Sequence, residues 1–219
     1  MSPERFAKII QVLDRRQLDL TVLMENVHKP HNVSAVMRTG DAVGIDEVHA
    51  VYPDEFIKGF HMTSGGTLKW LTPSLHPDLD TALNLLQGQG FQVLAAHLSE
   101  KAIDYRDADY TRPTALLLGA EKDGVSAEAA ARADQHIQIP MMGMGQSLNV
   151  SVAAAVILFE AQRQRREAGL YERKMLSEEV RMARLFEWAY PELADFCRKK
   201  GQNYPRLDEE GEIIDPIPH

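Results

Sequence analysis

The sequence predicts an α/β fold with a mostly parallel sheet. Short apolar segments of strand length alternate along the chain with segments whose apolar residues recur at helical spacing. A polar loop and then a helical segment follow most of the predicted strands, a pattern typical of βαβ units. With 219 residues, 44% of them hydrophobic and 26% charged, the chain has the composition of a globular protein that needs no disulfide or metal to stabilise its core.

The N-terminal segment, residues 1–18, is expected to be a helical extension. Ser2 followed by Pro3 is a favourable helix start, and apolar residues then recur at helical spacing over residues 3–16. Basic side chains lie along one flank of this helix. A solvated surface explains them as well as contact with RNA does, so both interpretations stay open.

The central segment, residues 19–170, contains the alternating strands and helices. The expected strands are 20–27, 47–52, 91–98, 114–119 and 136–140. The expected helices are 32–43, 78–87, 126–133 and 147–168. Residues 54–75 have few periodic signals and are expected to form a long loop with short strands, and such loops are often functional.

The last helix of this segment is apolar on all sides at residue 150 and over residues 152–159. A helix of this kind must be buried on several sides, by the sheet and, as one option, by a second subunit. Residues 171–219 are expected to form a C-terminal extension. Ser177 and Pro191 each begin a helix in it, and a loosely ordered tail is expected from Asp208 onward.

Composition excludes several classes of protein. The one cysteine, Cys197, excludes a disulfide framework and a cysteine-built zinc site, and no other metal-ligand spacing is present, so no metal is expected. No signal peptide is recognised and no apolar run is long enough to span a bilayer, so a soluble cytoplasmic protein is expected. The net charge of −8 argues against a nucleic-acid partner, except that residues 1–20 and 160–174 carry a small excess of base.

Three loop-to-helix junctions are the candidate functional elements: HKPHNVSAVMRTGDAVG (28–44), LLLGAEKDGVS (116–126) and IPMMGMGQSLNVSVAAAV (139–156). Each follows a predicted strand, which is where ligands bind in open α/β sheets. Gly119 would allow a ligand to approach the backbone closely. Each junction also has a structural explanation: an Arg38–Asp41 pair, an ordinary loop, and a helix capped by Ser147.

The three junctions resemble, in order, the three motifs of the SPOUT methyltransferases, and within them the RNA 2′-O-ribose methyltransferases of the TrmH (SpoU) type. The strings that carry the resemblance are ENVHKPHNVSAVMRTGDAVG, TALLLGAEKDGVS and IPMMGMGQSLNVSVAAAVILFEAQRQR. It covers nearly the whole chain, most clearly residues 15–170. It implies a deep trefoil knot in the C-terminal part of the sheet, S-adenosylmethionine as cofactor, a homodimer, and tRNA as partner, with no membrane or DNA partner.

The resemblance also implies roles for individual residues. The catalytic set is Arg38, Asn32, Glu121, Ser147 and Asn149. The cofactor contacts, largely backbone and apolar, are Ala96, Gly119, Ile139, Met141 and Leu148. The residues nominated for RNA are Arg5, Lys8, Arg15, Arg16, His31, Arg163, Arg165, Arg166 and Arg173. The chain departs from the family at Ala96, where some close relatives carry Thr, and at Leu18, where the family often has Pro.

The implied reaction moves a methyl group to the ribose 2′-hydroxyl of guanosine 18 in the D-loop of tRNA. A guanidinium stays protonated in proteins, so Arg38 has two possible roles. It could be deprotonated beside Glu121 and a tRNA phosphate, or it could position phosphate and hydroxyl while a phosphate oxygen or water takes the proton. The alternatives to this function are methylation of a ribosomal RNA guanosine and a non-catalytic RNA-binding protein that keeps the knot.

Overall fold

The computed structural model describes residues 1–52 and 69–216. These residues belong to two compact units. Gln17–Leu170 form the first, here called the sheet unit, and Met1–Arg16 together with Tyr171–His219 form the second, called the terminal unit. The two ends of the chain, which the sequence suggested were separate extensions, are therefore parts of one unit.

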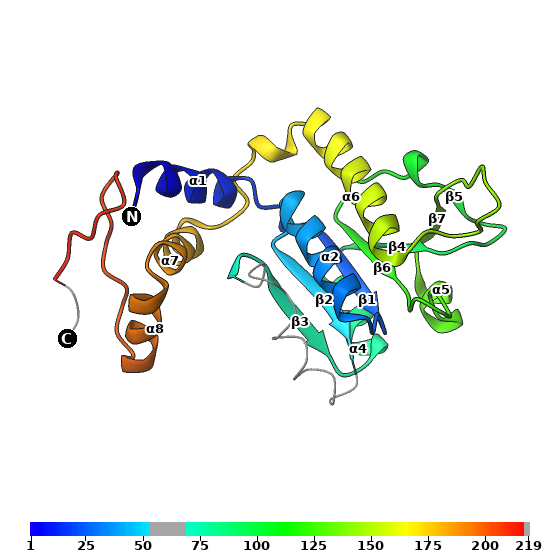
Figure 1. Ribbon diagram of the computed structural model, residues 1–219, viewed down its shortest axis with the longest axis horizontal. Helices are drawn as coiled ribbons and strands as arrows, with labels where there is room; N and C mark the ends of the chain where they lie inside the picture. Colours follow the sequence, from blue (N-terminus) through cyan, green and yellow to red (C-terminus); the bar gives the residue numbers. More distant parts are fainter. Residues whose placement is uncertain (53–68, 217–219) are drawn as a thin grey trace. The chain divides into compact units, whose positions relative to one another are not determined.

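A seven-stranded parallel sheet is the centre of the sheet unit (Figure 1). Its order is β3-β2-β1-β6-β4-β7-β5, and every described pairing is parallel. The strands are β1 (Leu20–Glu25), β2 (Glu47–Val51), β3 (Thr72–His76), β4 (Gln92–Ala96), β5 (Ile103–Asp104), β6 (Thr114–Leu118) and β7 (Gln135–Gln138). The predicted α/β class with a mostly parallel sheet is confirmed.

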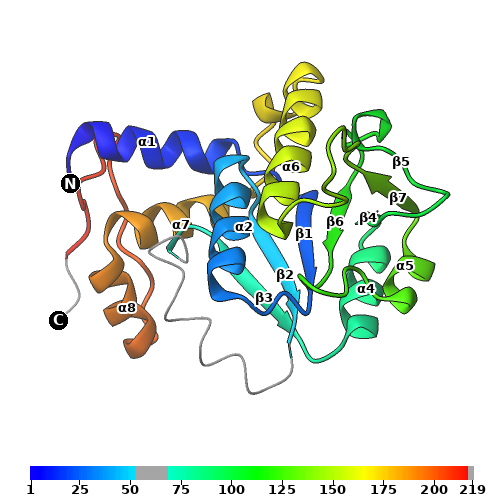
Figure 2. The same cartoon turned by 45° about the vertical axis from the view of Figure 1, so that its right-hand side comes forward.

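Helices cover both faces of this sheet (Figures 1 and 2). The helices α2 (Pro30–Ala42) and α6 (Val150–Glu167) share a buried apolar cluster with strand residues such as Val22 and Leu116. The helices α4 (Leu79–Gly88) and α5 (Ala127–Arg132) share a second cluster with Leu23 and Leu117, which point to the opposite face. Since the central strands are buried on both faces, they appear in the sequence as continuous apolar runs.

The structure differs from the expected elements in two places. The short strands β3 and β5 were not predicted as separate elements, because β5 has two residues and β3 contains a proline. The helix expected from residue 147 begins at Val150, since Asn149 and not Ser147 caps it: the Asn149 side chain accepts a hydrogen bond from the Ser151 amide at 2.8 Å. The expected loop over residues 54–75 lies mostly outside the described residues.

Three helices form the terminal unit: α1 (Pro3–Asp14), α7 (Glu178–Ala189) and α8 (Pro191–Lys200). Phe6, Ile9 and Leu13 of α1 pack against Leu185 of α7. Ser2 and Ser177 cap α1 and α7, and Gly201 ends α8 in the left-handed conformation that favours glycine. Two further segments, Tyr105–Asp107 in the sheet unit and Leu170–Glu172, form single 3₁₀ turns.

Local hydrogen bonds join residues of the segment after α8, where the sequence suggested a loose tail from Asp208. The Asp208 carboxylate accepts hydrogen bonds from the amides of Glu210 and Glu212, at 2.9 and 2.8 Å. Arg206 pairs with Asp215 at 2.8 Å. Local side-chain-to-backbone hydrogen bonds of this kind define a turn without an apolar pattern that the sequence could reveal.

No helix within residues 1–52 and 69–216 combines the length and the apolar character that crossing a bilayer requires.

Candidate active site

The three junctions lie at one edge of the sheet. Because β1, β6, β4 and β7 run parallel, their carboxyl ends meet at that edge, and the loops that follow them are neighbours in space. The first junction leads from β1 into α2, the second from β6 into α5, and the third from β7 into α6.

A chain of hydrogen bonds connects the three junctions through Asn32, Glu121 and Asn149. Asn32 Nδ2 donates to Glu121 Oε1 at 2.8 Å, and Asn149 Nδ2 donates to Asn32 Oδ1 at 3.2 Å. Asn32 is 1% exposed, so its amide depends on these partners rather than on water. Three of the five predicted catalytic residues are therefore in direct contact.

The carboxylate of Glu121 lies at the N-terminal end of α2. The backbone amide of Lys29 donates to Oε1 at 3.0 Å and that of His28 to Oε2 at 3.3 Å. Burial alone would raise the pKa of Glu121, but the hydrogen bonds from Asn32 and from these amides outweigh burial and lower it. Glu121 is thus a carboxylate at neutral pH, held by a helix terminus that favours negative charge.

The glycines of the second junction have a structural explanation. A Cβ on Gly119 would lie 2.0 Å from the carbonyl carbon of Gly124, because the turn folds directly over it. Ala120 and Gly124 exchange backbone hydrogen bonds of 3.0 and 2.9 Å across this turn, and Gly124 has a φ of +70°. The close approach expected at Gly119 is therefore made by the protein's own backbone.

The predicted cofactor contacts surround the carboxyl ends of β4, β6 and β7. Ala96 ends β4, Gly119 follows β6, and Ile139 follows β7. Ala96 and Ile139 both pack against the apolar cluster beneath α2 and α6. Met141 is half-buried and Leu148 is exposed at the other end of the third junction.

The third junction also offers unused backbone donors. Within the described part of the chain, the amides from 141 to 148 donate no hydrogen bond. Apolar walls with free backbone N–H groups beside them suit an adenine and an amino-acid chain. The residues present therefore fit S-adenosylmethionine.

Arg38 and His31 lie on the exposed side of α2, seven residues apart and so on one face of the helix. Among the described residues, neither side chain forms a hydrogen bond or an ion pair, and the alternative Arg38–Asp41 pair is not formed. Ser147 is exposed as well and is not joined to the hydrogen-bond chain. Arg38 is thus accessible to a ligand, and the Glu121 carboxylate is bound by other groups.

Most of the residues nominated for RNA are exposed, and two are not. Arg16 is buried with its guanidinium over the Trp188 ring, 5.4 Å from the ring centre. Arg165 is buried and donates to Gln17 Oε1 at 2.9 Å, to the Tyr110 carbonyl at 3.0 Å and to Asp19. Their assignment to an RNA-facing surface is wrong, because a buried guanidinium with protein partners is a structural group.

Besides His31 on α2, the other nominated residues are exposed on or just after α1 and α6: Arg5, Lys8, Arg15, Arg163, Arg166 and Arg173. Arg163 pairs with Glu160 and Glu167, both at 2.7 Å. These are surface pairs of small energy that a phosphate could replace.

Two residues that support the site were missed. The buried carboxylate of Glu25, at the end of β1, accepts the Ser126 amide at 2.9 Å and so ties the first strand to the second junction. The Tyr52 hydroxyl donates to the Val27 carbonyl at 2.7 Å, and burial together with the nearby Glu121 raises the pKa of that tyrosine. The sequence contains a signal that could have identified Glu25, because this charged residue ends an otherwise apolar strand. Nothing in the sequence singled out Tyr52.

Comparison with known proteins gives matches along almost the whole chain. The model of the SpoU rRNA Methylase family matches residues 19–159. A second model, which describes the C-terminal part of SpoU rRNA methylases, matches residues 163–216. The chain is 53% identical to a tRNA (guanosine(18)-2′-O)-methyltransferase of Escherichia coli, over 97% of this chain and 94% of that one. It is 59% identical to a protein of the same description from Thermus thermophilus, over 84% and 95%.

Solved structures agree with these matches. The TrmH/SpoU tRNA modifying enzyme of Aquifex aeolicus superposes with a TM-score of 0.76 at 42% identity, covering 86% of this chain and 96% of that one. The methyltransferase AviRb of Streptomyces viridochromogenes, solved in complex with AdoMet, superposes with a TM-score of 0.62 at 27% identity, over 70% and 64%.

Proposed function

Because this chain belongs to the SpoU family of RNA methylases, we propose that it transfers a methyl group from S-adenosylmethionine to the ribose 2′-hydroxyl of guanosine 18 in tRNA. The observation that carries the proposal is the hydrogen-bond chain Glu121–Asn32–Asn149, which joins the three family motifs at one edge of the sheet. Relatives described as tRNA (guanosine(18)-2′-O)-methyltransferases, at 53% and 59% identity, identify the nucleotide.

The cofactor binds at the carboxyl ends of β4, β6 and β7. When bound, S-adenosylmethionine supplies an electrophilic methyl group on a sulfonium. Backbone at Ala96, Gly119 and Ile139, with Met141 and Leu148, forms the walls of its site, and the free amides of the third junction are available as donors. The structure of the related methyltransferase AviRb, solved with AdoMet bound, supports this assignment.

Arg38 acts by positioning the RNA. Its guanidinium is exposed and, within the described residues, not paired, so it is available to hold a tRNA phosphate bidentately beside the 2′-hydroxyl. The Arg38 guanidinium stays protonated, and the Glu121 carboxylate accepts hydrogen bonds from Asn32 and from the amides of Lys29 and His28. A phosphate oxygen or water then accepts the hydroxyl proton. His31 lies on the same face of α2 as Arg38. His31 and Ser147 contact the RNA or the cofactor near the 2′-hydroxyl.

The C-terminal part of the sheet unit forms the trefoil knot of the family. From β6 the chain crosses β4 to reach β7, and α6 then returns to pack beside α2 over the middle of the sheet. This return path supports the proposal of a knot, and it brings the third junction back to the first two.

The active form is a homodimer built on α6 and the third junction. Val152 and Phe159 are 47% and 49% exposed on α6, and Met142 and Met144 are almost fully exposed. Apolar side chains at this density mark an interaction surface, and the sequence itself suggested that α6 is covered on more than one side.

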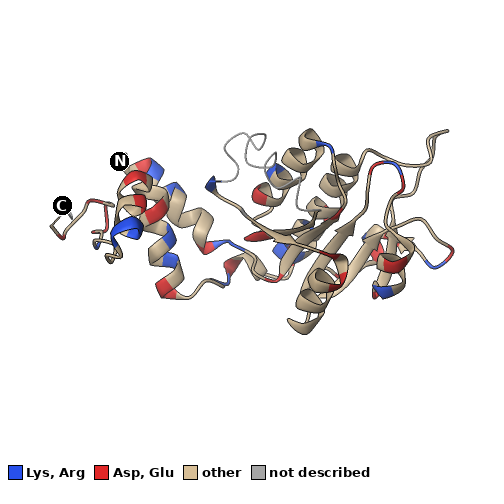
Figure 3. Cartoon of the chain, turned by 90° about the horizontal axis from the view of Figure 1, so that it is seen from below, with Lys and Arg blue, Asp and Glu red and all other residues tan. Residues whose placement is uncertain are grey.

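The tRNA contacts come from exposed basic residues: Arg5, Lys8, Arg15, Arg163, Arg166 and Arg173. The terminal unit holds 12 Lys and Arg against 13 Asp and Glu, whereas the sheet unit holds 12 against 19. Figure 3 shows both signs interspersed along the terminal helices. Such a nearly neutral surface gives a modest affinity for tRNA, which falls as the salt concentration rises. A tRNA-modifying enzyme of this kind works in the cytoplasm.

One experiment tests the function. The protein is incubated with labelled S-adenosylmethionine and unmodified tRNA, and the methyl group is mapped by nuclease digestion. A 2′-O-methyl group at guanosine 18 is the expected result, and a tRNA carrying 2′-deoxyguanosine at that position is the control that should accept none. Label on a base, or no label on tRNA at all, contradicts the proposal.

A further inference from the structure

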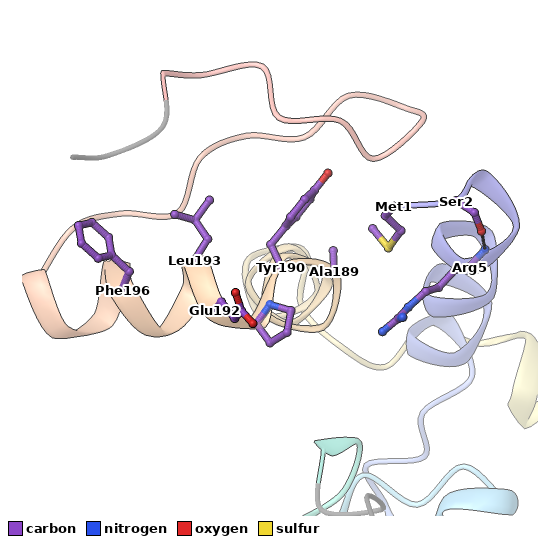
Figure 4. Close-up of a pocket in the computed structure, with 9 residues that line it drawn as sticks. Met1, Ser2, Arg5, Ala189, Tyr190, Glu192, Leu193 and Phe196 are labelled. Carbon is purple, nitrogen blue, oxygen red and sulfur yellow. Dashed lines mark hydrogen bonds between the residues drawn. The ribbon is translucent and has the colours of Figure 1, made fainter.

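A pocket of about 880 Å³ lies within the terminal unit, between the start of α1 and the junction of α7 and α8 (Figure 4). Its volume is in the range of small-ligand sites. Tyr190, Leu193 and Phe196 line one part of it, and Ser2 and Arg5 line the other. None of the residues in the three junctions of the sheet unit lines it.

The aromatic wall of the pocket is held rigidly. The Tyr190 hydroxyl donates to the Gly211 carbonyl at 2.7 Å, and its ring lies against Phe186 with the ring centres 5.7 Å apart. Gly211, at a φ of +88°, sits so close to Phe6 of α1 that an added Cβ would lie 2.6 Å from the ring. The C-terminal turn therefore anchors Tyr190 to α1, so the orientation of this ring is set before any ligand arrives.

The opposite wall is cationic. Arg5 is exposed, its guanidinium points into the pocket, and it forms no ion pair with the described residues (Figure 4). The Lys200 ammonium lies 5.8 Å from the centre of the Phe196 ring, which brings a second positive charge near the pocket. The acidic residue of the lining, Glu192, lies in the first turn of α8, where it offsets the positive end of that helix.

We propose that this pocket binds one unpaired nucleotide of the RNA substrate, with the base against Tyr190 and Phe196 and the phosphate at Arg5. Proteins bind bases that are not stacked in a duplex by placing them on aromatic side chains beside a cation. Every base has a face that can stack on such a side chain. A base within a duplex is stacked between its neighbours, so its faces are not available to these side chains. The proposal rests on the proposed function for the identity of the RNA, and it adds a contact with an unpaired nucleotide outside the methylation site.

The test compares variants of the full-length protein in binding to unmodified tRNA and to an RNA duplex of similar length. Phe196→Ala removes the stacking surface and Arg5→Ala removes the cation. Phe196→Trp restores an aromatic face, and Lys101→Ala removes an exposed cation from the sheet unit as a charge-matched control. Circular dichroism and thermal melting verify that each variant is folded.

We expect Phe196→Ala and Arg5→Ala to weaken tRNA binding about five- to tenfold or more. The KM for tRNA should rise while kcat at saturating tRNA and the affinity for S-adenosylmethionine stay unchanged. Phe196→Trp should bind tRNA as the wild type does, and binding of the duplex should be insensitive to Phe196→Ala.

Two results overturn the proposal. Unchanged tRNA affinity in both variants would leave the pocket without a role in RNA binding. An equal loss of duplex binding in Phe196→Ala would show that unpaired bases are not what this side chain recognises. Either result is distinct from failure of the proposed function, which is read from the position of the methyl group made by the wild-type protein.

Discussion

Asn32 Nδ2 donates to Glu121 Oε1 over 2.8 Å and so joins two loops that are 89 residues apart in the chain. The same side chain accepts from Asn149 Nδ2 through its own oxygen. A primary amide, with donors and an acceptor on one rigid group, is suited to sit between a carboxylate and a second amide. Its burial means that neither neighbour can be replaced by bulk water.

Replacing Asn32 by Ala should destabilise the protein by about 1–3 kcal/mol, because it removes the buried amide that joins Glu121 to Asn149 and both of its hydrogen bonds. Urea denaturation measures the change. Ser34→Ala, on the half-buried side of the same helix, is the control and should change the free energy of unfolding by less than about 0.5 kcal/mol. Equal effects of the two substitutions would argue against a structural role for Asn32.

The contribution of Glu121 should depend on pH. Its pKa in the folded state is lowered from the ordinary value of 4.5, so the bound carboxylate stabilises the folded state above that value, and the stabilisation is lost as the pH falls through the folded pKa. Wild type should therefore be more stable than Glu121→Gln at pH 7, and the gap should narrow from pH 4.5 downward. Denaturation curves at several pH values in this range measure the difference in stability. Glu128→Gln, at an exposed glutamate, is the control. A gap that stays constant with pH would contradict it.

Substitution of Arg38 by Ala should lower the rate of methyl transfer at least about 100-fold in a single-turnover assay, since the phosphate and hydroxyl would lose their positioning group. Binding of S-adenosylmethionine, measured by calorimetry, should be nearly unchanged because Arg38 is not among the cofactor contacts. Arg38→Lys tests the bidentate geometry and should recover little activity. Full turnover by Arg38→Ala would remove this residue from the mechanism.

Gly119→Ala should be destabilising by about 1–3 kcal/mol or more, because the new Cβ would overlap the backbone at Gly124 and the turn would have to shift. The affinity for S-adenosylmethionine should fall as well, since the turn adjoins its site. Gly88→Ala, at the end of α4, is the matched control: a Cβ at Gly88 meets no atom within 4 Å. Thermal melting and cofactor titration measure both effects, and a fully stable Gly119→Ala protein would contradict the contact.

The dimer proposed for α6 should dissociate when a charge is placed on its exposed apolar face. Phe159→Glu should shift the protein from dimer to monomer in sedimentation velocity, because an unpaired carboxylate cannot be buried in an interface. Leu85→Glu makes the same chemical change at a 41% exposed leucine of α4 and should leave the dimer intact. A wild-type protein that sediments as a monomer would refute the assembly itself.

The local elements could be predicted from the sequence because each has a local cause. Apolar runs buried on both faces marked the central strands, and helical spacing with Ser2, Ser126 and Ser177 as caps marked the helix starts. The motifs around Arg38, Glu121 and Asn149 also indicated the family. These signals depend on residues that lie within a few positions of one another, so no tertiary information is needed to read them.

Only the tertiary structure decided which polar groups serve the site and which serve the fold. Arg165 and Arg166 are adjacent in the sequence, yet the first is buried against Asp19 and Gln17 while the second is exposed. Gly119 is required by its own turn, and Asn149 rather than Ser147 caps α6. Each of these roles depends on partner residues that are far apart in the sequence and become neighbours only when the parallel strands are connected. Composition and periodicity carry no information about which distant residues become neighbours.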